Sequence, residues 1–277
     1  GTLGVVTEVE VTLLVKPESL LSGVVFFDRE DQLLALVRDA RAASLETRAS
    51  HGTQTIDARA LEYFDRESLE LLRAKYPAIP RCAAGAIFFE QETTAATEES
   101  HTAAWLALLE RHAALLDSSW FATEARDQDR LREYRHALPV LVNEWLARHS
   151  QRKVSTDIAV PDQHFAGMLR FYRATLGESK LQFVIFGHVG DNHVHVNILP
   201  RSDAEAARAR EIYMTFVRRA VSVGGTVSAE HGVGKLKREY LRELYGDRHL
   251  REMAELKRAF DPACILGRGN IFAEEFL

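Results

Sequence analysis

The order of strand-like and helix-like segments along residues 155–229 restricts the fold of this chain more than any other feature. Short apolar runs predict strands, and longer amphipathic stretches predict helices. The predicted order is a strand at 155–160, a helix at 162–176, strands at 182–188 and 193–199, a helix at 203–223 and a strand at 226–229. This is the split β-α-β pattern of a ferredoxin-like layer, an antiparallel sheet with helices on one face. The sequence therefore predicts an α+β fold.

The preceding segments are interpreted as a second unit of the same kind. The predicted strands lie at 5–15, 23–28, 84–90 and 118–123, and the predicted helices at 30–43, 58–76, 97–116 and 127–149, with a further helical segment from Lys235 onward. Asp57 is the expected N-cap of the helix over 58–76. Pro139 is expected to kink or break the helix over 127–149, because proline lacks a backbone N–H and clashes with the preceding turn.

Composition excludes several classes of protein. The chain has 277 residues, and its 35 basic against 40 acidic residues argue against a nucleic-acid platform. Only Cys82 and Cys264 are present, so we expect no disulfide framework and no cysteine-based zinc site. No stretch of 18 apolar residues and no leader pattern is found, which predicts no transmembrane span and no signal peptide. The expected location is the cytoplasm, with peripheral attachment at the inner membrane as the alternative.

Three histidines gather on one predicted hairpin, residues 187–197 (GHVGDNHVHVN). A two-residue turn at 191–192 would place His188 opposite His195 on one face, with Cβ atoms about 4.5–5.5 Å apart. Two imidazoles at that distance can share one metal ion. His193 lies on the same face and is a rival ligand. The alternative is that these histidines are hydrogen-bonded polar residues on a sheet surface.

A second group of reactive side chains follows at residues 228–234 (SAEHGVG). Glu230 offers a carboxylate ligand and His231 a base, and the nearby glycines let the backbone approach a ligand closely. With His188 and His195, Glu230 would complete three metal ligands and leave an open position for a substrate oxygen. An ordinary turn at a helix N-terminus is the alternative for this segment.

Two arginines one helical turn apart, Arg132 and Arg135, precede Pro139 in the predicted helix. A guanidinium can bind a carboxylate through two parallel hydrogen bonds, so this pair is a candidate for holding an acidic substrate. A solvated helix face is the alternative for this segment. Lys153, which precedes a predicted strand, allows the same two interpretations.

Four motifs in the same order resemble the C-terminal part of the flavin-linked 2-hydroxyacid dehydrogenases of the vanillyl-alcohol-oxidase superfamily. Members of that family include D-lactate dehydrogenase, the glycolate oxidase flavin subunit and D-2-hydroxyglutarate dehydrogenase. The motifs are residues 1–7 (GTLGVVT), which resemble the end of the FAD-binding domain, the hairpin at 187–197, the Glu-His-Gly loop at 228–234 and the C-terminal signature at 256–266 (LKRAFDPACIL). The resemblance covers the chain from end to end.

The resemblance implies a role for each matching residue. His188, His195 and Glu230 fall on the family's metal ligands, and His231 falls on its catalytic base. The resemblance further assigns substrate binding to Arg135, Asn197 and Lys153, and flavin contact to Gly1, Thr2, Gly4 and Asn270. This chain departs from the family pattern at three places: His193 stands where the family has Asn, Lys153 lies further from Pro161 than the family's Lys, and residues 267–270 (GRGN) replace Asn-Pro-Gly-Lys.

The resemblance also implies a division of the chain into three parts. Residues 1–17 would be the last strand of an FAD-binding domain that is otherwise absent. Residues 18–234 would be the ferredoxin-like substrate cap with the metal site, and residues 235–277 would be a helical segment that returns to the FAD-binding domain. The chain is therefore expected to be a fragment that is inactive by itself.

The function predicted from this resemblance is that of the catalytic cap of an FAD-dependent, metal-assisted D-2-hydroxyacid dehydrogenase. Hydride would pass from C2 of the substrate to FAD, with His231 as the base and zinc as the first choice of metal. The alternatives are a metal-dependent hydrolase and a non-catalytic cap that binds metal or a partner. The expected partners are a small 2-hydroxy acid, the FAD-binding domain, an electron acceptor or iron–sulfur protein, and a second copy of the chain.

Overall fold

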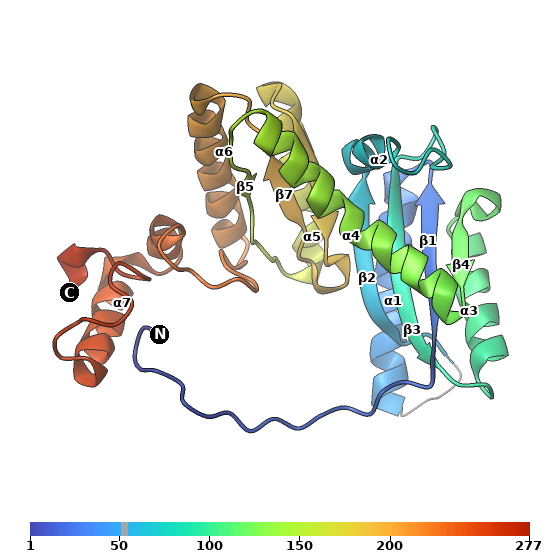
Figure 1. The fold of residues 1–277 in the computed structure, drawn as a ribbon, viewed down its shortest axis with the longest axis horizontal. Helices are drawn as coiled ribbons and strands as arrows, with labels where there is room; N and C mark the ends of the chain where they lie inside the picture. Colours follow the sequence, from blue (N-terminus) through green and yellow to red (C-terminus); the bar gives the residue numbers. More distant parts are fainter. Residues whose placement is uncertain (51–54) are drawn as a thin grey trace.

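A computed structural model describes residues 1–50 and 55–277 and contains one antiparallel sheet of seven strands (Figure 1). Within these residues the strands are β1 (Ser19–Phe27), β2 (Ala58–Asp65), β3 (Gly85–Thr93), β4 (Trp120–Ala122), β5 (Val154–Ser155), β6 (Phe183–Gly187) and β7 (His195–Ile198). The helices are α1 (Glu30–Ser50), α2 (Arg66–Leu72), α3 (Glu98–Arg111), α4 (Ala125–Arg148), α5 (Asp162–Ser179), α6 (Asp203–Ser222) and α7 (Arg238–Phe260), with short 3-10 turns η1 (Leu116–Ser118), η2 (Val189–Asp191) and η3 (Glu274–Phe276).

The strand order β4-β1-β3-β2-β6-β7-β5 consists of two ferredoxin-like units joined edge to edge. The first unit contains β1 to β4 and the second contains β5 to β7, whose fourth strand is reduced to a bridge between Ala159 and Thr226. The units meet where β2 pairs with β6, through Tyr63 opposite Gly187 and Phe64 opposite Phe186. The α+β prediction with antiparallel ferredoxin-like layers is confirmed.

Helices cover both faces of the sheet, whereas the prediction placed them on one face. Helices α1, α3, α5 and α6 pack on one face around a continuous apolar core that includes Phe27, Trp105 and Phe216. On the other face, α4 crosses both units diagonally and encloses a second core with Phe26 and Tyr134 (Figure 1). Helix α4 continues through Pro139 without the predicted break. Among the described residues, no helix combines the length and low polarity needed to cross a lipid bilayer.

The predicted helix over 58–76 is wrong in its first half, which forms β2. Residues such as Ala60, Leu61 and Glu62 favour helix by intrinsic propensity. Pairing with β3 along its length and with β6 at its end overrides that preference, because both faces of β2 are then buried against apolar side chains. Only Arg66–Leu72 is helical, and its N-cap is Asp65, whose side chain accepts a hydrogen bond from the Ser68 N–H.

The hairpin that carries the histidines does not have the predicted register. Phe186, rather than His188, lies opposite His195, and η2 replaces the two-residue turn at 191–192. The shift is two residues, and side chains in a strand alternate with a period of two, so the predicted face is preserved. Gly187 has a φ of +130° and ends β6, which leaves His188 just beyond the strand. His188 thereby stays close to His195.

The predicted strand over 5–15 is also wrong, because this extended segment pairs with no strand in the part of the chain that the structure describes. Seven of its apolar side chains are between 68% and 95% exposed. It runs from β1 toward α7, where residues 238–277 enclose a small separate core (Figure 1). There the buried Lys257 donates hydrogen bonds to the backbone oxygens of Thr2 and Leu266 and to Asp261.

Candidate functional site

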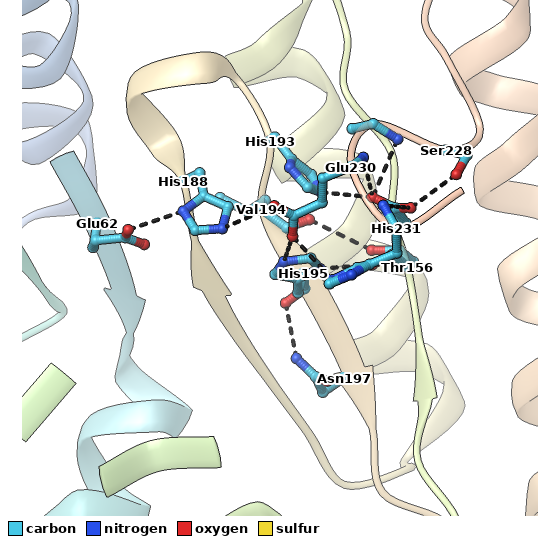
Figure 2. A network of polar contacts seen from close by, with 12 residues as sticks. Glu62, Thr156, His188, His193, Val194, His195, Asn197, Ser228, Glu230 and His231 are labelled. Carbon is cyan, nitrogen blue, oxygen red and sulfur yellow. Dashed lines mark hydrogen bonds and ion pairs between the residues drawn. The ribbon is translucent and has the colours of Figure 1, made fainter. Parts of the chain in front are cut away.

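The three predicted metal ligands lie close together beside the second unit of the sheet (Figure 2). Glu230 Oε1 is 3.0 Å from His195 Nε2, and Glu230 Oε2 is 3.4 Å from His188 Nε2. One ligand atom from each residue lies within 4.8 Å of the other two. His188 follows β6, His195 begins β7, and Glu230 comes from the loop after α6. Three separate segments therefore converge on a space that suits one metal ion.

Hydrogen bonds at the other ring nitrogens determine how these imidazoles face Glu230. His195 Nδ1 lies 2.9 Å from the backbone oxygen of Thr156, which can only accept, so Nδ1 carries the proton of the neutral ring. His188 Nδ1 donates in the same way to Glu62 Oε1 at 2.9 Å. Each neutral ring then presents an unprotonated Nε2 to the carboxylate oxygens of Glu230. A divalent cation among these atoms would satisfy all three groups, so the donor set fits a metal ion.

The charges around this cluster support an ionised carboxylate. The hydrogen bond with Glu62 is the main cause that raises the pKa of His188 above its ordinary value. Burial would raise the pKa of Glu230, but attraction to the protonated forms of the surrounding histidines, which appear as the pH falls, outweighs burial and holds that pKa below its ordinary value. Glu230 therefore stays negatively charged at neutral pH, as a metal ligand must.

Glu62 is a site residue that the sequence interpretation missed. Its side chain is buried, and the same oxygen, Oε1, contacts both Arg135 Nη2 at 2.5 Å and His188 Nδ1 at 2.9 Å. Arg135 projects from α4 and Glu62 from β2, so this contact connects the first unit to the metal cluster. An arginine has five N–H donors, and one of them serves Glu62. Arg135 keeps further donors for a second carboxylate.

His231 is the most exposed member of the cluster. Its side chain is 67% exposed, and its Nε2 lies 3.0 Å from Glu230 Oε1. An imidazole beside a carboxylate at the edge of a metal site can exchange a proton with a bound molecule and with water. The structure thus places the predicted base next to the predicted ligands.

A buried carboxylate that the sequence interpretation also missed, Asp157, lies behind the cluster. Burial would raise its pKa, but the ammonium group of Lys237 and the backbone N–H groups of His231 and Glu230 lower the pKa to about 2. The rival ligand His193 is buried, with Nε2 3.1 Å from Asp157 Oδ1. Burial, together with the nearby His195, lowers the pKa of His193 to about 4, so its ring is neutral at physiological pH.

The other predicted site residues lie at varying distances from the cluster. Asn197 is fully buried in β7, and its side-chain amide donates to the backbone oxygen of His195 in the same strand at 3.3 Å. Its side chain is therefore not exposed to solvent. Lys153 is exposed just before β5. Asn270 lies in the loop after Gly267, where Gly1 approaches closely, while Gly4 has open space around it.

A polar pocket of about 520 Å³ opens beside His188 and Arg135. Its lining includes further arginines from α1 and β2, Arg41, Arg48 and Arg59, together with Glu62 and Glu90. Such a pocket suits a small polar anion that reaches the metal cluster from the side of Arg135.

Comparisons with known proteins agree with this fold. The chain is 28% identical over 286 residues to the glycolate oxidase subunit GlcD of Bacillus subtilis, covering 99% of this chain and 56% of that protein. It is 31% identical to the D-lactate dehydrogenase [cytochrome] 1, mitochondrial, of Saccharomyces cerevisiae, covering 98% and 45%, and 28% identical to the D-2-hydroxyglutarate dehydrogenase of Stutzerimonas stutzeri, covering 99% and 57%. The chain thus spans about half the length of the curated relatives it matches.

Solved structures show the same fold in more distant proteins. A 4-ethylphenol oxidase from Gulosibacter chungangensis matches 95% of this chain and 56% of its own, with a TM-score of 0.63 and 14% identity. A p-cresol methylhydroxylase matches 92% and 53%, with a TM-score of 0.61 and 14% identity. The family model described as "FAD linked oxidases, C-terminal domain" matches residues 16–271, which is most of the chain. This chain therefore belongs to the family of FAD-linked oxidase C-terminal domains.

Proposed function

We propose that this chain is the substrate- and metal-binding part of an FAD-dependent D-2-hydroxyacid dehydrogenase of the lactate, glycolate or 2-hydroxyglutarate class. The observation that carries the proposal is the convergence of three metal-ligand side chains with Arg135 beside them. Metal binding requires only His188, His195 and Glu230. Binding of a 2-hydroxy acid also requires a positively charged group for the substrate carboxylate, and Arg135 provides that group. Family membership and the activities for which the relatives are named support the same reaction class.

The residues of this chain would divide the work as follows. Arg135, already oriented by Glu62, would hold the substrate carboxylate through its free N–H donors. His231 Nε2 would donate its hydrogen to the Glu230 carboxylate, so the other ring nitrogen, Nδ1, would take the proton of the 2-hydroxyl group, and Glu230 would stabilise the imidazolium. When bound, a divalent ion on His188, His195 and Glu230 would lower the pKa of that hydroxyl, and FAD would accept the hydride from C2. The products would be a 2-oxo acid and reduced flavin.

The FAD-binding part would be supplied by a separate domain of the same enzyme. The exposed apolar side chains of residues 5–15 support this proposal, because an extended segment with such side chains is suited to pair with the edge of another sheet. Residues 1–2 and 267–270 lie together near Lys257 and would meet the flavin domain at one place. A metal-dependent hydrolase would use a similar ligand set, but membership of an FAD-linked oxidase family favours oxidation.

Metal binding by the 277-residue chain tests the first half of the proposal. We expect about one divalent ion per chain by elemental analysis and calorimetry, with zinc bound first and manganese, iron or cobalt as substitutes. His188→Ala and Glu230→Ala should each lose the ion. His249→Ala is the matched control, because that exposed histidine lies on α7 and its Nδ1 contacts the backbone oxygen of Tyr245 in the same helix. Full metal content in both ligand variants would contradict the proposal.

Turnover of 2-hydroxy acids tests the second half and needs the chain joined to an FAD-binding domain. We expect D-2-hydroxy acids to bleach the flavin absorbance band under anaerobic conditions, and 2-oxo acids to appear in equal amount. The chain by itself should be colourless and inactive, because the described residues contain no dinucleotide-binding fold. Hydrolysis of esters or amides without any change in the flavin band would support the hydrolase instead.

A further inference from the structure

The segment that carries Glu230 and His231 has no helix or strand to hold it. Residues 227–232 lie in bends and irregular backbone between α6 and α7. Beyond the bridge at Thr226, their backbone is joined to the neighbouring segment by the Ala229 N–H, which donates to the Asp157 backbone oxygen at 3.0 Å. A metal ligand must nevertheless keep its position to within a few tenths of an ångström. Some other interaction must therefore fix this loop.

The buried carboxylate of Asp157 supplies a further interaction. Its two oxygens accept hydrogen bonds from three successive backbone N–H groups, those of Ala229 at 3.1 Å and of Glu230 and His231 at 3.2 Å each. Ser228 Oγ donates to the same carboxylate at 3.1 Å. Successive N–H groups that converge on one anion form a concave backbone site with a defined shape. The carboxylate thus determines the path of the loop at each residue from 228 to 231.

Lys237 completes the arrangement from the other side. Its ammonium group contacts the Asp157 carboxylate and also donates to Ser228 Oγ at 3.1 Å and to the backbone oxygen of Gly232 at 2.9 Å. Lys237 stands immediately before α7, and Asp157 follows β5. The ion pair therefore holds the loop at Ser228, near its start, and at Gly232, near its end.

Asp157 also belongs to a second possible ligand group with His193 and Glu230, whose ligand atoms lie within 4.8 Å of one another. The contacts argue against metal binding there. Both oxygens of Asp157 are already occupied by N–H and O–H donors, and the ammonium of Lys237 would repel a cation. The carboxylate is suited to hold the loop and not to hold a metal ion.

Thr156, the residue before Asp157, contacts the other side of the metal-ligand cluster. The backbone oxygen of Thr156 accepts the hydrogen bond that orients His195, while Asp157 orients the loop of Glu230. Asp157 itself is held through its backbone N–H, which donates to the Tyr213 hydroxyl of α6 at 3.1 Å. Two consecutive residues thus set the relative positions of two metal ligands.

We propose that the buried Asp157–Lys237 ion pair is a positioning device that places Glu230 and His231 for metal binding and proton transfer. The inference rests on the proposed function, since it concerns the same metal site. It assigns a role to two residues that touch neither the metal nor the substrate. Removing the charge of Asp157 should loosen the loop while leaving both ligand side chains in the chain.

The test uses the 277-residue chain with Asp157→Asn, which keeps the shape of the side chain and removes its charge. In metal-free protein, we expect the amides of residues 229–231 to exchange with solvent at least tenfold faster than in the parent, with no change in β1 and β3. With metal, we expect the affinity for zinc to fall 10- to 100-fold, the usual effect of removing a group that orients a ligand. Lys237→Gln should give the same changes to a smaller extent.

Asp261→Asn is the matched control. Asp261 is also a buried carboxylate that pairs with a lysine, Lys257, and accepts a backbone N–H, that of Leu266, but it lies at the far end of α7. Its variant should lose stability without changing zinc affinity more than twofold. Unchanged amide exchange at 229–231 in Asp157→Asn would overturn the inference. So would equal losses of zinc affinity in the two Asp variants.

The two readouts separate failure of this inference from failure of the proposed function. If the parent chain binds no metal, the proposed function fails, yet the amide exchange of metal-free protein still decides whether Asp157 holds the loop. If the parent binds metal and Asp157→Asn binds it equally well, the positioning role is refuted while the metal site stands. If Asp157→Asn does not fold, Lys237→Gln with the same two measurements decides the outcome.

Discussion

The two ferredoxin-like units of the sheet share one order of elements but differ in how far their strands extend. In the first unit, β1, β2 and β3 have nine, eight and nine residues. In the second, β5, β6 and β7 have two, five and four, and the fourth strand is a single bridge. The connection between the second and third strands along the chain contains α2 in the first unit, between β2 and β3. In the second unit the corresponding connection, between β6 and β7, contains the histidine-bearing turn η2. Where strand pairing ends early, side chains and backbone groups become available for chemistry.

The two units are nevertheless coupled at the site. All three candidate ligands come from the second unit and the loop after it, whereas the first unit supplies Glu62. Arg135 reaches the same place from α4, which lies across both units. Glu62 on the long strand β2 thus orients His188, which lies just beyond the end of the short strand β6. Substitutions in the two units should therefore have separable effects.

The largest difference between the effect on activity and the effect on stability is expected at His231. In a protein that also carries the FAD-binding domain, His231→Ala should lower kcat by about 10²- to 10⁴-fold, the usual effect of removing a general base, with little change in KM. Its exposed side chain makes the free energy of unfolding insensitive to the change. Steady-state kinetics with a 2-hydroxy acid and chemical denaturation would measure both. His249→Ala should change neither quantity, and a pure KM effect at His231 would show that it binds substrate instead.

Phe26→Ala should produce the opposite pattern in the first unit. Phe26 is fully buried and packs edge to face against Trp120, with ring centroids 5.2 Å apart. Removing such a side chain costs about 3–5 kcal/mol of unfolding free energy, because a cavity remains. Urea denaturation would measure the loss, and calorimetry on the folded variant should give the parent's zinc affinity. Weaker zinc binding by the folded variant would show that the two units are not separable.

Removal of the metal should affect the second unit alone. An ion that binds only the folded state adds about 2.7 kcal/mol of stability when present at 100 times its dissociation constant. We expect a chelator to remove this increment in thermal unfolding. Hydrogen exchange should then rise at residues 188–199 and 228–234 and stay constant in β1 and β3. A uniform rise over both units would contradict the comparison.

Glu62→Gln tests the contact between the units. The amide keeps the size of the side chain but weakens both the hydrogen bond to His188 and the pair with Arg135. Zinc affinity should fall about 10- to 100-fold, as for other groups that orient a ligand histidine. Glu92→Gln is the control, because Glu92 forms an exposed pair with Arg59 on the same sheet, with 3.2 Å between the charged atoms. Equal zinc affinities in the parent and Glu62→Gln would refute a role for Glu62.

Arg135→Ala should give the smallest of these effects. A charge-assisted pair with the substrate carboxylate contributes about 1.5–3 kcal/mol, so KM should rise at least about tenfold with a smaller fall in kcat. Arg132→Ala, one helical turn away and paired with Asp129, is the control. If kcat falls and KM stays constant in Arg135→Ala, Arg135 does not hold the substrate carboxylate.

Local patterns in the sequence are enough to predict most of the helices and strands, because the spacing of apolar residues differs between a helix and a strand. The helices at 162–176 and 203–223 are predicted close to α5 and α6. The strand β2 escapes prediction, since its residues favour helix and only its neighbours β3 and β6 make it a strand. That error hides Glu62, because a residue assigned to a separate helix cannot be placed beside His188.

The candidate ligands can be predicted even though the register of their hairpin cannot. A slip of two residues leaves His195 on the expected face, so His188 still approaches it. A slip of one residue would have separated them. Asp157 cannot be found in the same way, because the loop residues and the lysine that its carboxylate binds lie 71 to 80 residues later in the chain. Contacts of that range come from the folded path of the chain, which no local pattern encodes.

The contacts of Lys257 have a consequence for how the molecule could be divided and recombined. Its ammonium group binds the Thr2 carbonyl across 255 residues of chain and the Leu266 carbonyl across nine. The chain therefore departs from and returns to a single location, as an inserted module does. A lobe with closely spaced ends can be exchanged between related enzymes at one junction without altering the host's topology. Under the proposed function, residues 3–256 would include the substrate contacts, so exchange at this junction would transfer those contacts and leave the flavin-binding part of the host unchanged.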